Sequence, residues 1–121
     1  MKNENYDIND FRNNDDWKSA FLQVGLGKPD SNYGYELPDT YLNFVKRVVC
    51  CDRGYNDEVN WICVVELEDG TYVVVDAGCD YTGWDCQAWG TADIFETEGE
   101  ALSNLNPEQA ERLQVLNVGH N

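Results

Sequence analysis

Residues 61–77, WICVVELEDGTYVVVDA, decide the fold of this chain. Two valine-rich runs flank Asp69-Gly70, a dipeptide that is among the strongest short signals for a β-hairpin. The stretch therefore predicts two antiparallel strands joined by a two-residue turn. A turn of that length also sets the register, because it places Cys63 opposite Asp76.

Two further runs extend the hairpin into a meander. Residues 41–50, YLNFVKRVVC, combine valines with aromatic residues and predict a strand before the hairpin. Residues 87–95, QAWGTADIF, predict a fourth strand after it. Antiparallel order brings the end of the first strand, at Cys50 and Cys51, to the same end of the sheet as Cys79. The sequence thus predicts an antiparallel β-meander of three to four strands.

The segment before the sheet contains one predicted helix. A capping Asn14 or Asp15 precedes an apolar stripe at helical spacing, formed by Trp17, Ala20, Phe21 and Val24. Residues 1–14 are rich in Asn and Asp, and we expect a loosely ordered arm or an irregular turn there. Prolines, glycines and other turn residues predict a loop over residues 28–39.

A second helix is predicted after the sheet. Asn106 can cap it, with Pro107 at the first helical position and Gln109 at the third. Its apolar face would consist of Ala110, Leu113 and Leu116. A further helical turn is expected over residues 98–105. Because a chain of 121 residues supports one core, we predict a single α+β domain, residues 1–121, with an N-terminal and a C-terminal helix packed on the sheet.

The charge of the chain is strongly negative and unevenly distributed. The net charge is −15, and the stretch from Gly54 to Glu111 contains 14 acidic residues and no lysine or arginine. Concentrated like charge destabilises the compact state and is most useful when a basic surface balances it. Lys46, Arg47 and Arg53 form the only basic cluster, so direct nucleic-acid binding is not expected. We expect instead a basic, nucleic-acid-handling protein as the partner.

Ten carboxylates of this acidic stretch are the predicted partner-binding residues: Asp57, Glu58, Glu66, Glu68, Asp69, Asp80, Asp85, Glu96, Glu98 and Glu100. Glu66 and Glu68 have the spacing of one strand face and Asp69 follows at the turn, so these three are expected to form one patch. Tyr81, Trp84 and Trp89 could add aromatic contact area. In the alternative interpretation, both tryptophans pack in the core and fix their loop to the sheet.

Five cysteines allow a structural metal site. Four of them fall on two strand ends and one loop at the same end of the predicted sheet: Cys50, Cys51, Cys79 and Cys86. Four thiolates suit tetrahedral Zn²⁺. No CxxC pair is present, however, and two alternatives stay open: reduced cysteines packed in the core, and a disulfide. Cys63 is predicted to be a small core residue, and His120 is an additional candidate ligand.

No catalytic residue is predicted. The serines stand in no nucleophile motif, and the chain lacks a phosphate-cradling glycine loop and a dinucleotide fingerprint. Asp76, Asp80 and Asp85 could gather Mg²⁺, but no basic residue nearby would hold a phosphate. An enzyme is therefore not expected. No stretch approaches the roughly 20 apolar residues of a membrane span.

Residues 79–87, CDYTGWDCQ, resemble a motif of small acidic proteins encoded by phages and mobile elements. In that group, a hairpin ending in a similar motif is followed by a short helix that is similar to LNPEQAERL, residues 105–113. Such proteins include anti-CRISPR inhibitors. The resemblance thus implies an inhibitor of a Cas9-type effector in the cytoplasm of a bacterial host. Of the predicted zinc ligands, Cys79 and Cys86 belong to the motif, whereas Cys50 and Cys51 do not.

Two other functions stay open at this point. An immunity-type protein that neutralises a basic toxin or nuclease would need the same charge distribution. A zinc-stabilised structural or regulatory phage protein would need no charged target at all, and its binding would be insensitive to salt.

Overall fold

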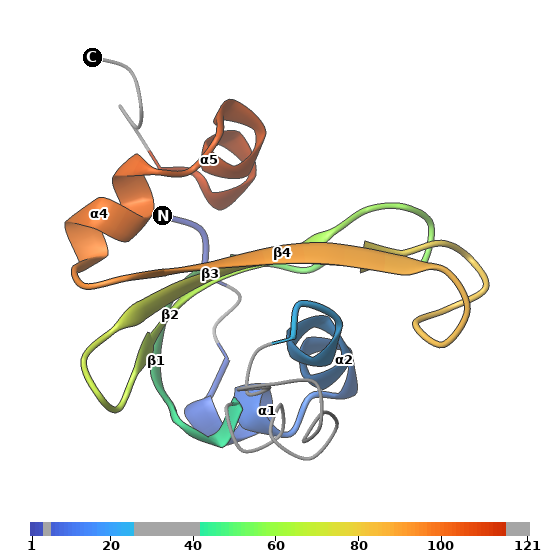
Figure 1. Ribbon diagram of the computed structural model, residues 1–121, viewed down its shortest axis with the longest axis horizontal. Helices are drawn as coiled ribbons and strands as arrows, with labels where there is room; N and C mark the ends of the chain where they lie inside the picture. Colours follow the sequence, from blue (N-terminus) through green and yellow to red (C-terminus); the bar gives the residue numbers. More distant parts are fainter. Residues whose placement is uncertain (4–5, 26–41, 116–121) are drawn as a thin grey trace.

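A four-stranded antiparallel sheet lies at the centre of the computed structural model, which describes residues 1–3, 6–25 and 42–115 (Figure 1). The strands lie side by side in chain order and are β1 (Val45–Asp52), β2 (Trp61–Leu67), β3 (Tyr72–Cys79) and β4 (Ala88–Phe95). This confirms the predicted meander and the α+β class. The loop predicted over residues 28–39 lies outside the described residues, as do Leu116 and His120.

Helices cover both faces of this sheet (Figure 1). The helices are α1 (Ile8–Arg12) and α2 (Asp15–Gln23) on one face, and α4 (Glu98–Ser103) and α5 (Pro107–Leu113) on the other. Because side chains alternate between the faces of a strand, each central strand contributes to two cores. In β2, Cys63 and Val65 pack towards α1 and α2, whereas Ile62 and Val64 pack towards α4 and α5. Burial on both faces explains why this strand is a nearly continuous apolar run.

Residues 6–14 form packed structure where the sequence predicts a loosely ordered arm or an irregular turn. The carboxylate of Asp7 accepts the N–H of Asn9 (2.8 Å) and caps α1. Phe11 is fully buried, and its ring centroid lies 5.2 Å from that of Trp17. A five-residue helix is too short to show its periodicity in the sequence. Its stability comes from aromatic packing against α2.

The two predicted helices begin at the predicted caps. At α2, the side-chain oxygen of Asn14 accepts the N–H of Trp17 (3.0 Å). At α5, Asn106 and Gln109 form a capping box in which each side chain accepts the other residue's N–H, at 2.9 and 2.8 Å. Two residues of the predicted apolar face of α5, Ala110 and Leu113, are buried against the sheet.

The turn of the central hairpin is one residue longer than predicted. The N–H of Leu67 donates to the carbonyl of Thr71 (2.8 Å), so the turn consists of residues 68–70. Gly70 has a φ of 89°, and a three-residue hairpin loop needs this left-handed conformation at its last position. Asp69-Gly70 therefore does mark the hairpin, but as the last two residues of a three-residue loop.

The longer turn shifts the register of β2 against β3 by one residue. Cys63 faces Val75, and Asp76, its predicted partner, lies opposite Ile62. Residues opposite each other in an antiparallel pair share a face of the sheet. Asp76 therefore lies on the face that α4 and α5 cover, while Cys63 lies on the opposite face.

Candidate protein-interaction surface

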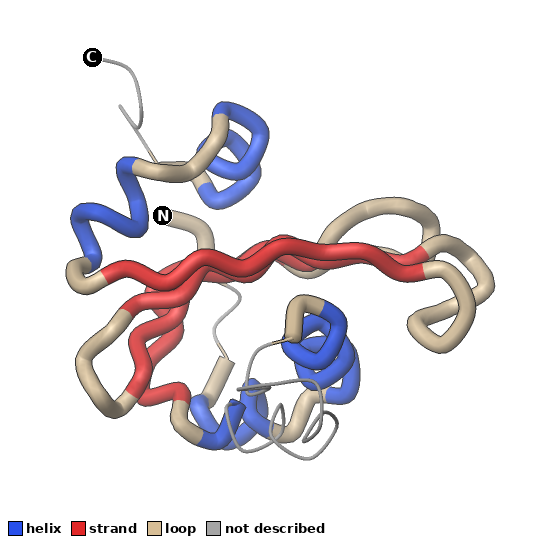
Figure 2. Tube along the Cα trace, in the orientation of Figure 1, coloured by secondary structure: helices blue, strands red, loops and turns tan. Residues whose placement is uncertain are grey.

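Two connections lie together at one end of the sheet, beyond the helices (Figure 2). They are residues 53–60, between β1 and β2, and residues 80–87, between β3 and β4, and we call them the loop end. The N–H of Glu58 donates to the carbonyl of Cys79 (3.0 Å) and ties the first connection to the start of the second. The loop end is therefore one surface built from two separate segments of the sequence.

The CDYTGWDCQ connection consists of two consecutive turns. Gly83 donates its N–H to the carbonyl of Asp80 (3.0 Å), and Cys86 donates its N–H to the carbonyl of Gly83 (3.2 Å). The Asp80 carboxylate also accepts the N–H of Thr82 (2.9 Å) and the Thr82 hydroxyl. Gly83 has a φ of 99°, which L residues adopt only with strain. The motif thus encodes the shape of this loop.

The tryptophans of this region fix the loop end to the rest of the fold. The ring centroid of Trp84 lies 5.1 Å from that of Trp61. The Nε1 of Trp84 donates to the carboxylate of Asp16 in α2 (3.2 Å). The Nε1 of Trp89 donates to the side-chain oxygen of Asn60 (2.8 Å). Trp84 and Trp89 are both half-buried, which agrees with the alternative in which they hold the loop on the sheet. Tyr81, in contrast, is 80% exposed.

A polar network continues from Trp89 to α5. The amide of Asn60 donates to one carboxylate oxygen of Asp76 (2.5 Å), and the amide of Gln109 donates to the other (2.8 Å). Gly78 makes room for this network, because a Cβ at that position would lie 2.2 Å from the side-chain oxygen of Asn60. Asp76 thus joins three segments of the fold and has a structural role.

Ion pairs within the chain occupy several of the ten predicted partner-binding carboxylates. The guanidinium of Arg47 donates to Glu98 (2.8 Å) and to Glu66 (3.0 Å), and these hydrogen bonds raise the pKa of Arg47 above its ordinary value. Glu68 lies 3.7 Å from the guanidinium of Arg12. These three carboxylates are therefore balanced by cations of the same chain.

The predicted patch of Glu66, Glu68 and Asp69 is divided in the structure. Glu66 lies on the strand face towards α4, whereas Glu68 pairs with α1 on the opposite face of the sheet. Asp69 accepts the hydroxyl of Thr71 (2.6 Å) and its N–H (2.9 Å), and these bonds lower the pKa of Asp69. The patch is divided because the turn has three residues, which makes Glu68 a turn residue instead of the next position on the strand.

Four of the predicted carboxylates lie at the loop end: Asp57, Glu58, Asp80 and Asp85. Within the described part of the chain, no lysine or arginine forms an ion pair with any of them. Tyr55 and Tyr81, which belong to the same two connections, are 69% and 80% exposed. The sequence contains no signal that distinguishes Tyr55 from a buried tyrosine. The other two carboxylates, Glu96 and Glu100, are exposed near the start of α4.

Glu58 has a backbone conformation that is unfavourable for a glutamate. Its φ is 67°, in the left-handed region, at the end of the short turn that Tyr55 and Val59 close through a hydrogen bond of 2.9 Å. This conformation costs an L residue about 1–2 kcal/mol. Gly54 packs tightly beneath the turn, since a Cβ there would lie 2.0 Å from the carbonyl oxygen of Val59. The strain is thus held by the surrounding structure.

The four predicted zinc ligands do not come together. Cys50 and Cys51 point to opposite faces of the sheet, because adjacent strand residues alternate. Cys79 is buried at the end of β3, and Cys86 is exposed in the second connection. Among the described residues, no three His, Cys, Asp or Glu side chains are placed to hold a metal ion. The arrangement does not fit a four-thiolate site, and zinc binding stays a prediction to be measured.

The buried thiols are also poorly suited to ionise. Burial raises the pKa of the Cys50 thiol to about 12. Burial, together with the neighbouring Cys51, raises the pKa of Cys63 well above its ordinary value. Metal binding and nucleophilic reactions both need the thiolate. These cysteines therefore correspond to the alternative of reduced thiols packed in the core.

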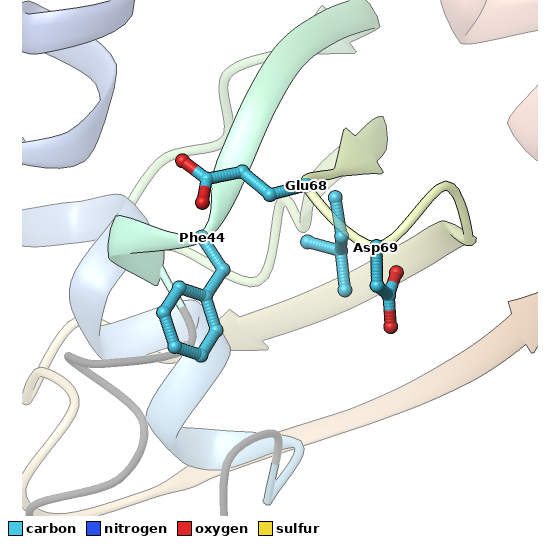
Figure 3. Close-up of a pocket in the computed structure, with 4 residues that line it drawn as sticks. Phe44, Glu68 and Asp69 are labelled. Carbon is cyan, nitrogen blue, oxygen red and sulfur yellow. The ribbon is translucent and has the colours of Figure 1, made fainter.

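A pocket of about 500 Å³ lies at the opposite end of the sheet (Figure 3). Its described lining consists of Phe44, Leu67, Glu68 and Asp69 (Figure 3). Phe44 is 48% exposed. No Ser, Cys or His side chain belongs to this described lining.

The protein is thus an α+β meander with helices on both faces of the sheet, and its loop end presents carboxylates and tyrosines. Comparison with protein-family models, with curated proteins and with solved structures gives no match. The resemblance of residues 79–87 to phage proteins thus stays an expectation. None of the described helices has the length and apolar character needed to cross a membrane.

Proposed function

We propose that this protein inhibits a nucleic-acid-handling protein, a CRISPR effector such as Cas9, by binding its basic channel through the loop end. In this mechanism, the carboxylates of the loop end replace the phosphates of a nucleic-acid strand. The exposed tyrosines add contact area that charge alone does not supply. Inhibition is stoichiometric and needs no catalytic residue.

The observation that supports this function most strongly is that exposed carboxylates of the loop end form no ion pair within the described structure, although Arg53 belongs to the same connection. Carboxylates that lie near an arginine or lysine in the described structure, such as Glu66 and Glu98, already have their charge balanced by an ion pair. Asp57, Glu58 and Asp85 are exposed and form no such ion pair in the described structure. Their charge is therefore available to a basic partner.

The strain at Glu58 supports the same function. A glycine would fit its left-handed backbone without a steric penalty. The glutamate instead places a negative charge at this position, and the surrounding structure holds its strained backbone. Strained residues of this kind cluster at binding and catalytic sites. We therefore assign Glu58 to the partner-binding set.

An immunity-type inhibitor of a basic toxin or nuclease is the second candidate, because the same unpaired carboxylates support it. The identity of the target separates the two. We expect the protein to bind guide-loaded Cas9 and to reduce DNA cleavage, whereas an immunity protein would bind a basic nuclease and leave Cas9 active.

The test reverses two loop-end charges, Asp57→Lys and Asp85→Lys, in one variant. Asp80 is left unchanged because its carboxylate shapes the loop through Thr82. The matched control, Glu108→Lys with Glu111→Lys, changes the net charge equally on exposed positions of α5. Binding to Cas9 is measured between about 50 and 200 mM salt, a range in which electrostatic binding weakens.

We expect the loop-end variant to lose most of its inhibition and much of its salt dependence, while the α5 control keeps both. Equal losses in both variants would show that net charge acts without a defined surface, which contradicts a role for the loop end. Full inhibition by the loop-end variant would remove these carboxylates from the mechanism.

A further inference from the structure

Within the described part of the chain, the outer edge of β4 presents backbone groups that no other segment pairs with. The N–H of Asp80 donates to the carbonyl of Gln87 (3.0 Å), which makes this a hydrogen-bonded pair at the start of the β3–β4 ladder. Hydrogen-bonded and non-hydrogen-bonded pairs alternate along an antiparallel ladder, and the register of these strands is continuous. The N–H and C=O groups of alternate residues must therefore point away from β3: Ala88, Gly90, Ala92 and Ile94.

The opposite edge of the sheet, along β1, is protected. The carbonyl of Lys2 accepts the outward N–H of Cys51 (3.0 Å), and the guanidinium of Arg12 donates to the carbonyl of Val45 (2.6 Å). Two register irregularities interrupt β1, and Lys46 lies within it. Covering groups, bulges and lysines are the features by which proteins prevent a strand edge from pairing with another chain.

None of these protecting features occurs at β4. The strand pairs with β3 at eight successive residues without a bulge and contains no proline and no lysine. No residue of β4 is buried, and the described backbone hydrogen bonds outside the β3 ladder include none from its residues. Within the described structure, β4 is therefore a long, regular edge that is open to a further strand.

The side chains along this edge indicate what kind of strand fits. On one face stand small or aliphatic residues: Ala88, Gly90, Ala92 and Ile94. Val24, at the end of α2, packs over Gly90, whereas Ile94 is 53% exposed. On the other face, Asp93 is exposed and carries a negative charge. A partner strand that alternates aliphatic and basic residues would match both faces.

We infer that the open edge of β4 binds an extended segment of the basic partner, with alternating aliphatic and Lys or Arg residues, as an added fifth strand. This rests on the proposed function and specifies how the same partner is held. A second copy of the chain fits less well, because each copy carries a net charge of −15 and would bring a second Asp93 to the edge.

The first experiment uses a ten-residue synthetic peptide of alternating valine and lysine, and measures amide hydrogen exchange residue by residue. In the free protein, the amides of Ala88, Gly90, Ala92 and Ile94 should exchange fast. Peptide binding should slow them at least about tenfold, the change that one added hydrogen bond can produce. The control peptide has the same charges but N-methyl groups on alternate residues, and it should give no protection.

The second experiment removes one outward donor without touching the ladder to β3. Proline is tolerated on edge strands where the N–H faces outward, so Ala92→Pro should keep the fold, which thermal unfolding verifies. It should weaken peptide binding about tenfold, while the matched Ala92→Val, which keeps the N–H, should not. If the proline variant does not fold, hydrogen exchange of the unmodified protein still tests whether the peptide pairs with the edge of β4.

Peptide binding without slower exchange at these four amides would overturn the inference. Equal binding of the N-methylated peptide would do the same, since charge alone would then suffice. A free protein that sediments as a dimer with these amides already protected would show that a second copy occupies the edge.

If Ala92→Pro inhibits Cas9 as well as the unmodified protein does, the edge is not used although the proposed function stands. If neither variant nor parent binds Cas9, the peptide experiment tests the edge independently.

Discussion

Replacing Asp52 by asparagine should destabilise the protein in a pH-dependent way. Its carboxylate, 15% exposed, bonds with the ammonium of Lys2 and the guanidinium of Arg112, both at 2.8 Å. It thereby joins the N-terminal segment, β1 and α5. Burial raises the pKa of Asp52, but the hydrogen bonds from Lys2 and Arg112 outweigh that effect and leave the pKa below its ordinary value.

The size of the effect follows from these two bonds. A hydrogen bond to a charged group contributes about 1.5–3 kcal/mol, and partial exposure of Lys2 screens one of them. Asparagine keeps some hydrogen bonding but no charge. We therefore expect Asp52→Asn to lower the free energy of unfolding by about 2 kcal/mol at pH 7, or the Tm by roughly 6–8 °C.

The pH dependence follows from the direction of the pKa shift. A carboxyl whose pKa is lower in the folded state stabilises the protein fully above its ordinary pKa, and this contribution is lost as the pH falls through the folded-state pKa. Urea unfolding from pH 7 to about pH 2.5 should thus show the two proteins converging below about pH 4. The control, Asp57→Asn at an exposed position, should stay within about 0.5 kcal/mol throughout. Equal stability of Asp52→Asn and the parent at pH 7, or a difference that is as large at the lowest pH as at pH 7, would refute this reasoning.

Three further predictions concern the loop end and the cysteines. Glu58→Gly should stabilise the protein by roughly 0.5 kcal/mol in urea unfolding, because relief of about 1–2 kcal/mol of backbone strain exceeds the entropic cost of glycine. The same variant should bind the partner more weakly. A loss of stability would contradict the strain at this residue. A thiol reagent should label one cysteine, Cys86, in the folded protein and all five after denaturation, since the other four are buried. Metal analysis of protein purified without added zinc should give a zinc ratio near zero, and a ratio near one would restore the predicted site.

Local signals in the sequence predicted most of the secondary structure. The valine-rich runs and Asp69-Gly70 gave the hairpin, and the caps at Asn14 and Asn106 gave two helix starts. These predictions hold because turn, cap and strand preferences act between residues only a few positions apart. The helix at residues 8–12 was not predicted, since it is stabilised by contacts of Phe11 with another helix rather than by its own sequence.

The candidate site was predicted only in part. Among the ten carboxylates, the sequence could not separate those that pair with Arg47 or Arg12 from those at the loop end, because the pairing residues are far away in the chain. The zinc prediction placed four cysteines at one end of the sheet, but Cys50 and Cys51 point to opposite faces and Cys86 is exposed in the second connection. Strand order alone makes β4 an edge, but only the tertiary structure shows that Lys2 and Arg12 cover the opposite edge, along β1.

By itself, the sequence determined the α+β class, the order of the strands and the acidic character of residues 54–111, because these depend on local pattern and composition. The tertiary structure decided where the negative charge is left unbalanced. The three-residue turn divided the predicted patch at Glu66 and Glu68, and one hydrogen bond from Glu58 to Cys79 joined two loops into one acidic surface. Charge is a property of the sequence, but its availability to a partner depends on which cations the fold brings within a few ångströms.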